Sequence, residues 1–211
     1  MYKKSLLSPS ALFESEHASQ KSSICDLTFK SPEKTGLNYC EVEKGENMKT
    51  TKDTAPIITM LSDFGLRDAY VAEMKAVILS ISPKVRIVDI SHEVEKFNIR
   101  MGAFILASAA PYFPRGTVHV AVVDPGVGTK RRPIIIKTKR SFYVGPDNGL
   151  LLLSAQKEEV SHVYHIKNPE YMHPKISTTF HGRDVFAPAA AHLALGCSPS
   201  RFGPEIHDFI V

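Results

Sequence analysis

The sequence predicts an α/β fold, in which a layered α/β/α domain surrounds a largely parallel central sheet. Three observations support this prediction. Short apolar runs typical of strands alternate with segments whose apolar residues repeat at helical spacing. Polar clusters follow the strand-like runs, at the positions where ligands bind in such sheets. The composition, with 43% hydrophobic and 23% charged residues, is ordinary for a soluble globular protein.

The first part of the chain differs from the rest. Residues 1–54 are rich in Ser, Lys and Glu, and their apolar residues show no lasting period. A segment of this composition cannot bury much apolar surface, so we expect a disordered extension there. The α/β domain is expected over residues 55–211.

Two strand–helix pairs are predicted in the first half of the domain. Each helix has a clear end signal: the first stops before Pro83, and Pro111 and Pro114 close the second. Each strand is a short run rich in apolar residues. The predicted elements are a strand over 56–61, a helix over 69–81, a strand over 85–90 and a helix over 99–110.

More strands are expected in the second half. Residues 117–123 are apolar apart from one threonine and one histidine, and they predict a third strand. Further strands are expected over 133–137 and 141–144. An apolar helix begins near Val185.

Composition also excludes several classes of protein. The net charge of +4 is modest and the basic residues are scattered, which argues against nucleic-acid binding. Apolar stretches are far shorter than the roughly 20 residues that a membrane-spanning helix needs. The first residues do not resemble a signal peptide, so we expect a cytoplasmic protein. Cys25, Cys40 and Cys197 form no CxxC pair and are expected to be reduced thiols.

The most unusual motif runs from Val122 to Arg132 and reads VVDPGVGTKRR. It places Asp124 at a strand end, followed by a Pro-Gly turn and two arginines, of which Arg131 is the first. One interpretation is a turn in which Asp124 accepts backbone hydrogen bonds and the arginines are solvated. The other is a site in which carboxylate and guanidinium act together. A phosphate-binding loop is disfavoured because the glycines and lysine do not match GxxxxGK[ST].

A second motif, TTFHGRD, places Phe180 and His181 just before the last predicted helix. Asp184 could simply be the N-cap of that helix. The positive end of the helix dipole is expected to lower the pKa of His181. A neutral imidazole at this position could accept or relay a proton.

Two further motifs each allow a structural and a ligand-binding interpretation. GPDNG contains Asn148 and predicts a tight turn, which is compatible with a ligand contact. SDFGLRD carries Asp63 and Asp68 on one loop, where they could hold hydroxyl and amino groups of a ligand or cap the next helix.

Metal binding is a rival explanation for so many His and Asp residues. The sequence contains no HExxH or other close pair of metal ligands. We therefore expect no catalytic metal. The residues considered are His92, His119, Asp124, His181 and Asp184.

The four motifs, in this order, resemble the S-adenosyl-methionine hydroxide adenosyltransferase family, whose relatives include fluorinases and chlorinases. The resemblance covers about Pro56 to Pro204 and rests on SDFGLRDAYVAEMKAVI, VHVAVVDPGVGTKRRPI, GPDNGLL and TFHGRDVFAPAAAHLA. It implies an N-terminal α/β domain, a C-terminal β-barrel domain and a homotrimer with active sites between subunits. It also implies attack on the ribose C5′ of S-adenosyl-methionine, which is the substrate, with no cofactor.

The resemblance also implies roles for individual residues. Asp124, Arg131 and His181 would be the catalytic residues that activate water. Asp63 would hold the ribose diol, and Asp68 would lie near the methionine end. The remaining expected substrate contacts are Phe97, beside the ribose, together with Asn148 and Phe180.

The chemistry agrees with these residue types. The sulfonium leaves as a neutral thioether, so the main requirement is a water molecule held in line with the C5′–S bond. Asp124 and His181 can accept hydrogen bonds from that water and take a proton, while Arg131 keeps Asp124 ionised and oriented. A halide nucleophile is disfavoured because an ionised Asp124 would repel it.

The chain ends at Val211, where the family's barrel domain is expected to begin, so we expect the barrel to be absent. Three hypotheses follow. The chain is a hydrolase of S-adenosyl-methionine or its fragment, a halogenase, or an inactive module that binds nucleosides or assembles with a partner. Remote contacts orient a reacting centre, so without the barrel we expect weak binding and slow turnover.

Overall fold

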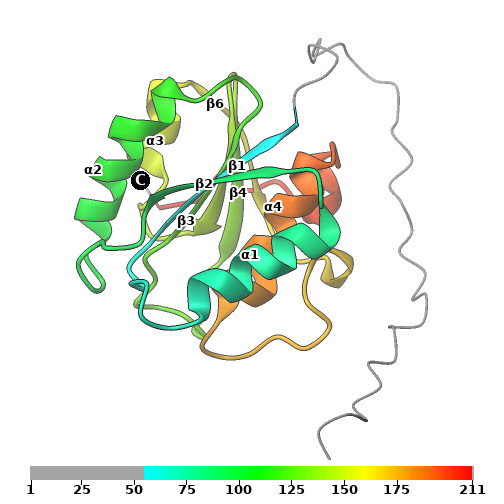
Figure 1. Cartoon of the computed structure of the whole chain (residues 1–211). Helices are drawn as coiled ribbons and strands as arrows, with labels where there is room; N and C mark the ends of the chain where they lie inside the picture. Colours follow the sequence, from blue (N-terminus) through cyan, green and yellow to red (C-terminus); the bar gives the residue numbers. More distant parts are fainter. Residues whose placement is uncertain (1–54, 211) are drawn as a thin grey trace, which may run out of the picture. The chain divides into compact units, whose positions relative to one another are not determined.

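The computed structural model describes residues 55–210, and the extension predicted over 1–54 lies outside them (Figure 1). The described part contains one six-stranded sheet in the order β2-β1-β3-β5-β4-β6. Neighbouring strands β2, β1, β3 and β5 are parallel, and β4 is antiparallel to both of its neighbours. The largely parallel sheet is therefore confirmed. The strands are β1 (Ile57–Ser62), β2 (Arg86–Ser91), β3 (Val118–Val122), β4 (Pro133–Thr138), β5 (Phe142–Pro146) and β6 (Val160–His165).

Helices lie on both faces of the sheet, as the layered prediction requires (Figure 1). On one face, α1 and α4 pack together over a core that includes Ile58, Val120 and Phe186. On the other face, α2 and α3 cover a core that includes Leu61 and Leu106. The helices are α1 (Tyr70–Ile81), α2 (Ile99–Ala109), α3 (Leu152–Lys157) and α4 (Ala187–Ala194).

Short helical turns join several of these elements. A π-helix, η3 (Gly182–Phe186), leads directly into α4. The 3₁₀ turns are η1 (Ala110–Tyr112), η2 (Pro169–Tyr171) and η4 (Pro199–Phe202). No helix among residues 55–210 is long and apolar enough to cross a membrane.

Every strand and helix that the sequence predicts is present, with ends that differ by at most two residues. The second predicted helix ends as α2 at Ala109 and continues as η1, because Pro111 cannot donate the hydrogen bond that a longer α-helix needs. Its start is fixed by the Asn98 side chain, which accepts a hydrogen bond from the Met101 amide (3.0 Å). The helix α3 and the strand β6 were not predicted from the sequence.

The register of the neighbouring strands β1 and β3 brings two carboxylates to the same edge of the sheet. Ser62 at the end of β1 pairs with Val122 at the end of β3. Asp63 and Asp124 therefore follow neighbouring parallel strands at the same edge of the sheet. This edge is where ligands bind in sheets of this type.

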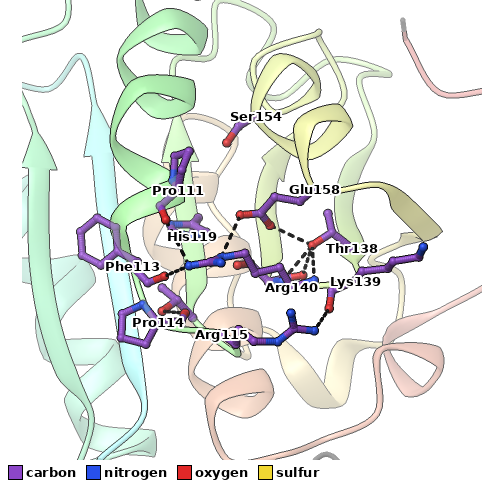
Figure 2. A network of polar contacts seen from close by, with 12 residues as sticks. Pro111, Phe113, Pro114, Arg115, His119, Thr138, Lys139, Arg140, Ser154 and Glu158 are labelled. Carbon is purple, nitrogen blue, oxygen red and sulfur yellow. Dashed lines mark hydrogen bonds and ion pairs between the residues drawn. The ribbon is translucent and has the colours of Figure 1, made fainter.

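A buried polar network lies where β3 begins, away from the ends of β1 and β3 that carry the carboxylates. Figure 2 shows the Arg140 guanidinium reaching toward the end of α2, where its Nη2 donates to the carbonyls of Pro111 (3.1 Å) and Phe113 (2.7 Å). Glu158 lies 3.7 Å from Arg140 Nε, and His119 is fully buried nearby. The network ties α2 and the β4–β5 turn to the sheet.

Candidate active site

A cavity of about 250 Å³ opens at the carboxyl ends of β1 and β3. Its walls come from the loop after β1, the start of α1, the segment before α2, the end of β3 with the loop that follows it, and the residues around the start of η3. The lining residues are Asp63, Phe64, Tyr70, Lys96, Phe97, Val122, Asp124, Val127, Thr179, Phe180, His181 and Gly182.

Asp124, Arg131 and His181 form one hydrogen-bonded unit. Arg131 Nε donates to Asp124 Oδ1 (3.0 Å), and Arg131 Nη2 donates to Asp124 Oδ2. The same Nη2 lies 3.1 Å from His181 Nδ1. Both partners of the ion pair are buried, with 7% of the Arg131 side chain and 5% of the Asp124 side chain exposed. The structure thus brings the three predicted catalytic residues together.

This geometry fixes the protonation of His181. A guanidinium can only donate, so Nδ1 of His181 must accept and carries no proton. The neutral imidazole then carries its proton on Nε2. Burial lowers the pKa of His181 most, Arg131 lowers it further, and Asp124 and Asp184 raise it. The predicted direction is confirmed, but burial rather than the helix dipole is the main cause.

The loop that carries Asp124 folds tightly against the segment that carries His181. Gly128 has φ +75°, and a Cβ at this position would lie 2.3 Å from the Thr178 carbonyl oxygen. Only glycine fits both the backbone conformation and this close approach. The Thr129 hydroxyl donates to the Gly126 carbonyl (2.7 Å) and closes the turn. These contacts bring Arg131 and His181 within hydrogen-bonding distance.

Asp63 and Phe97 meet at the other side of the cavity. The Phe97 amide donates to Asp63 Oδ2 (2.8 Å), and Phe97 has φ +62°, which is unusual for a bulky side chain. The hydrogen bond offsets the strain of this conformation, and strained backbone of this kind is concentrated at functional sites. The Phe97 side chain is 58% exposed. Lys96 donates to the Asp63 carbonyl (3.1 Å) and lies over the rings of Phe64 and Phe97.

Three aromatic rings form one wall of the cavity. Phe180 contacts Tyr70 edge to face at 4.8 Å between ring centroids, and Phe64 lies 5.8 Å from both. Of these, the sequence analysis proposed only Phe180. Phe64 lies inside the SDFGLRD motif and could have been found there, whereas nothing in the sequence singles out Tyr70 or Lys96.

Two predicted substrate-binding residues do not line the cavity. Asp68 is exposed on the loop before α1. Asn148 donates to the Val123 carbonyl (2.9 Å) and accepts from the Leu150 amide (3.1 Å), as expected for the turn interpretation. Asn148 therefore holds the backbone beside Asp124 rather than facing the cavity.

A second cluster of catalytic residue types lies beneath the cavity. Ser62 Oγ is 2.7 Å from His92 Nδ1, and His92 Nε2 is 3.2 Å from Asp89 Oδ1. The order resembles a serine nucleophile with its base and orienting acid. Ser62 is only 1% exposed and also accepts from the Phe64 amide, so it cannot reach a ligand. The cluster supports the loop that carries Asp63 and Phe64.

The same part of the chain offers no metal centre. Within residues 55–210, no three His, Cys, Asp or Glu side chains come together in an arrangement that could hold a metal ion. His92 and His119, two of the candidates considered, make hydrogen bonds to Ser62 and Thr59 instead.

Comparisons with known proteins show the family of the chain. The family model for the SAM hydroxide adenosyltransferase N-terminal domain matches residues 58–203. The chain is 45% identical over 154 residues to a protein of Salinispora arenicola named (R)-S-adenosyl-L-methionine hydrolase, covering 72% of this chain and 59% of the relative. It is 29% identical over 184 residues to a fluorinase of Nocardia brasiliensis, covering 76% of this chain and 61% of the relative.

A solved structure has the same fold. The crystal structure of an uncharacterized conserved protein from Thermotoga maritima matches with a TM-score of 0.71 and 45% identity, covering 73% of this chain and 60% of that one. The chain thus spans about three fifths of the length of the relatives that it matches.

Proposed function

Because the chain belongs to the S-adenosyl-methionine hydroxide adenosyltransferase family, we propose that its cavity binds S-adenosyl-methionine and hydrolyses it to adenosine and methionine. The observation that carries this proposal is the Asp124–Arg131–His181 unit at the cavity wall. The S. arenicola relative, of which the chain covers 59%, is named as a hydrolase of this substrate.

The proposed reaction is a displacement at the ribose C5′. The oxygen of a water molecule attacks C5′, and the C5′–S bond breaks with its electron pair going to sulfur. The sulfonium thereby becomes the neutral thioether of methionine, so no acid is needed at the leaving group. The water proton passes to the Asp124 carboxylate and from there to solvent. The reaction needs no cofactor.

The hydrogen bonds assign different tasks to the two groups that could act as bases. His181 Nδ1 is occupied by Arg131, and a neutral His181 can only donate from Nε2. We therefore assign proton acceptance to Asp124 and the orientation of the water oxygen to His181. Arg131 holds both groups and disfavours a positively charged His181.

Substrate contacts follow from the cavity walls. Asp63 retains one free carboxylate oxygen, which suits a ribose diol. Phe97 and Phe180 offer apolar surface for the sugar and the base. Asp68 is proposed for the methionine end, outside the lining described above. The homotrimer and the cytoplasmic location stay predictions.

A halogenase is the second candidate, because a fluorinase is among the relatives. A halide site needs neutral donors and no nearby negative charge. Asp124 lines the cavity, with an exposed fraction of 8%, and would repel a halide. The greater identity to the hydrolase, 45% against 29%, points in the same direction.

The test is incubation of the purified protein with S-adenosyl-methionine, with and without chloride. Chromatography then separates adenosine from 5′-chloro-adenosine. Adenosine in both samples, lost in Asp124→Asn, would support the hydrolase; 5′-chloro-adenosine would support the halogenase.

Asp147→Asn is the matched control for Asp124→Asn. Asp147 is also a buried carboxylate paired with an arginine, Arg132, at 2.7 Å, but it does not line the cavity. If a folded protein gives neither product but still binds adenosine in calorimetry, the chain is a nucleoside-binding module and the proposed activity is wrong.

A further inference from the structure

The cavity wall formed by residues 179–182 is held from behind by a chain of charged side chains. Arg183 Nη1 donates to Glu73 Oε2 on α1 (2.8 Å), and Arg183 Nε donates to Asp184 Oδ1 (2.7 Å). Asp184 Oδ2 accepts from the Ser177 amide (2.8 Å). Glu73, Arg183 and Asp184 are called the brace below.

Asp184 closes the loop that leads to Phe180 and His181. Its carboxylate binds the Ser177 amide, its own carbonyl accepts from the His173 amide (2.8 Å), and its amide donates to the Phe180 carbonyl (3.1 Å). The Asp184 side chain is completely buried. Burial raises its pKa, but hydrogen bonds from Arg183 and Ser177 outweigh burial and leave that pKa lowered. Asp184 therefore holds the loop closed through these hydrogen bonds and is not the N-cap that the sequence suggested.

The brace also touches the cavity wall directly. The Arg183 guanidinium lies 5.0 Å from the centre of the Phe180 ring, and the same ring contacts Tyr70 edge to face. Gly182 packs closely against its neighbours, because a Cβ would lie 3.0 Å from Met74 Sδ and 3.2 Å from the Phe180 ring. A side chain at this position would therefore push against both neighbours.

We propose that Arg183 and Asp184 are positioning residues, which hold Phe180 and His181 in the geometry that the reaction requires. This proposal rests on the proposed function, since it concerns the same cavity. Neither residue lines the cavity, so each acts through its neighbours. The π-helix η3 that contains both is a form of helix found frequently at functional sites.

The position of Asp184 gives it a second effect on His181. The charged groups around His181 are Arg131 and Asp124 from the loop after β3 and Asp184 from η3, with Asp63 and Lys96 on other walls of the cavity. Asp184 raises the pKa of His181. Loss of the Asp184 charge therefore lowers the pH at which His181 titrates, whereas a change at Arg183 that keeps its charge leaves that pH in place.

The test compares Arg183→Lys and Asp184→Asn with wild type and with Lys139→Gln. Lys139 belongs to an exposed ion pair with Glu159 and serves as the control for loss of a charge pair. Three measurements are made on the full chain: the steady-state kinetics, which give kcat and KM, the titration midpoint of the His181 NMR signal, and the nuclear Overhauser effect between the Phe180 and Tyr70 rings. The His181 signal is assigned from its loss in His181→Asn.

Arg183→Lys is expected to lower kcat/KM about 100-fold, the size of loss that a displacement of about 1 Å causes, mainly through kcat. It should also weaken the Phe180–Tyr70 effect. Asp184→Asn should move the His181 midpoint to lower pH, and Lys139→Gln should change none of these quantities. Variants that match wild type in all three would overturn the proposal.

The two NMR measurements need no turnover. If wild type fails to hydrolyse S-adenosyl-methionine while both NMR changes occur, the proposed function fails and the positioning role stands. If Asp184→Asn does not fold, the ring contact in Arg183→Lys decides: an unchanged contact rejects the brace.

Discussion

The hydrogen bond from Arg131 to His181 sets the protonation state in which the site can work. Nδ1 accepts this bond only while it carries no proton. Protonation of Nδ1 would turn the contact into a repulsion between two cations and would release the imidazole from its place. Activity should therefore depend on neutral His181.

This requirement predicts the acid limit of the reaction. Because burial and Arg131 lower the pKa of His181 below its ordinary value of 6.5, more than half of His181 is neutral at pH 6.5. We expect kcat/KM to fall to half of its plateau value only below pH 6.5. A pH–rate profile with its half-maximum at or above pH 6.5 would contradict this assignment.

The two carboxylates of the SDFGLRD motif should differ in the ligands that they affect. Asp63 lines the cavity and Asp68 is exposed beyond it. Asp63→Asn is expected to weaken the binding of both adenosine and S-adenosyl-methionine by about tenfold or more, which is the effect of losing a hydrogen bond to a charged group. Asp68→Asn should weaken the binding of S-adenosyl-methionine only, because adenosine lacks the methionine end. Titration calorimetry with both ligands measures the difference, and equal losses in Asp68→Asn would reject its proposed place.

Among the structural elements, the loop after β3 depends on Gly128. Gly128→Ala adds a Cβ 2.3 Å from the Thr178 carbonyl oxygen and forces a residue with a side chain to adopt φ +75°. We expect the free energy of unfolding to fall by about 2 kcal/mol or more. Gly149→Ala is the control, because Gly149 has φ +89° but no atom within 4 Å of an added Cβ. Urea unfolding of both variants separates the effect of the close contact with Thr178 from that of the backbone strain. Equal losses of unfolding free energy in the two variants would show that the contact with Thr178 is unimportant.

The polar network where β3 begins makes stability depend on pH. Burial, followed by Arg140, lowers the pKa of His119 to about 4 from its ordinary 6.5 (Figure 2). The unfolded chain therefore takes up a proton at a higher pH than the folded chain does. The stabilisation is complete above pH 6.5 and is lost as the pH falls toward 4, by about 3 kcal/mol at about 1.4 kcal/mol per pH unit.

His119→Gln measures this contribution, because Gln can keep a hydrogen bond to Thr59 but does not titrate. We expect wild type to lose more unfolding free energy than the variant between pH 7 and 4. If the unfolding free energies of the two proteins change with pH in parallel, protonation of His119 does not destabilise the folded chain.

The elements that the sequence predicts are those with a long or purely apolar pattern. β3 is apolar at nearly every position, and α1 repeats its apolar residues over three turns. The two missed elements lack such patterns: α3 has six residues, too few for a helical period, and β6 mixes two valines with histidines, a serine and a tyrosine. The π-helix η3 was also not predicted, because the apolar spacing of its sequence does not distinguish it from the α-helix that follows.

The candidate site follows the same division. The sequence places Asp63 and Asp124 just after predicted strands, and the pairing of β1 with β3 brings the ends of these strands to the same edge of the sheet. Phe97 enters the cavity through a positive φ and a bond to Asp63, which no local pattern reveals, and here the family resemblance supplied it. Tyr70 and Lys96 enter through tertiary packing and were not predicted. Asn148 serves the backbone of Val123 because its turn lies beside the end of β3.

For the molecule as a whole, ligand binding should be visible as added stability. The cavity joins the loop after β1, the start of α1, the segment before α2, the end of β3 and the start of η3, so a ligand that fills it favours the folded chain. Adenosine at about 100 times its Kd is expected to add about 2.7 kcal/mol, which corresponds to roughly 5–10 °C in Tm. Thermal unfolding followed by circular dichroism measures this shift, and no shift at saturating adenosine would mean that the cavity is not a nucleoside site.

The packing of α4 against α1 has a consequence for synthesis of the chain on the ribosome. These helices are neighbours in space, although more than 100 residues separate them in the sequence. Until residues 179–194 have emerged, α1 and the strands beneath it keep an apolar face open to water, and the cavity lacks its His181 wall. The nascent chain therefore passes through a long interval in which chaperones can bind it but its own ligand cannot.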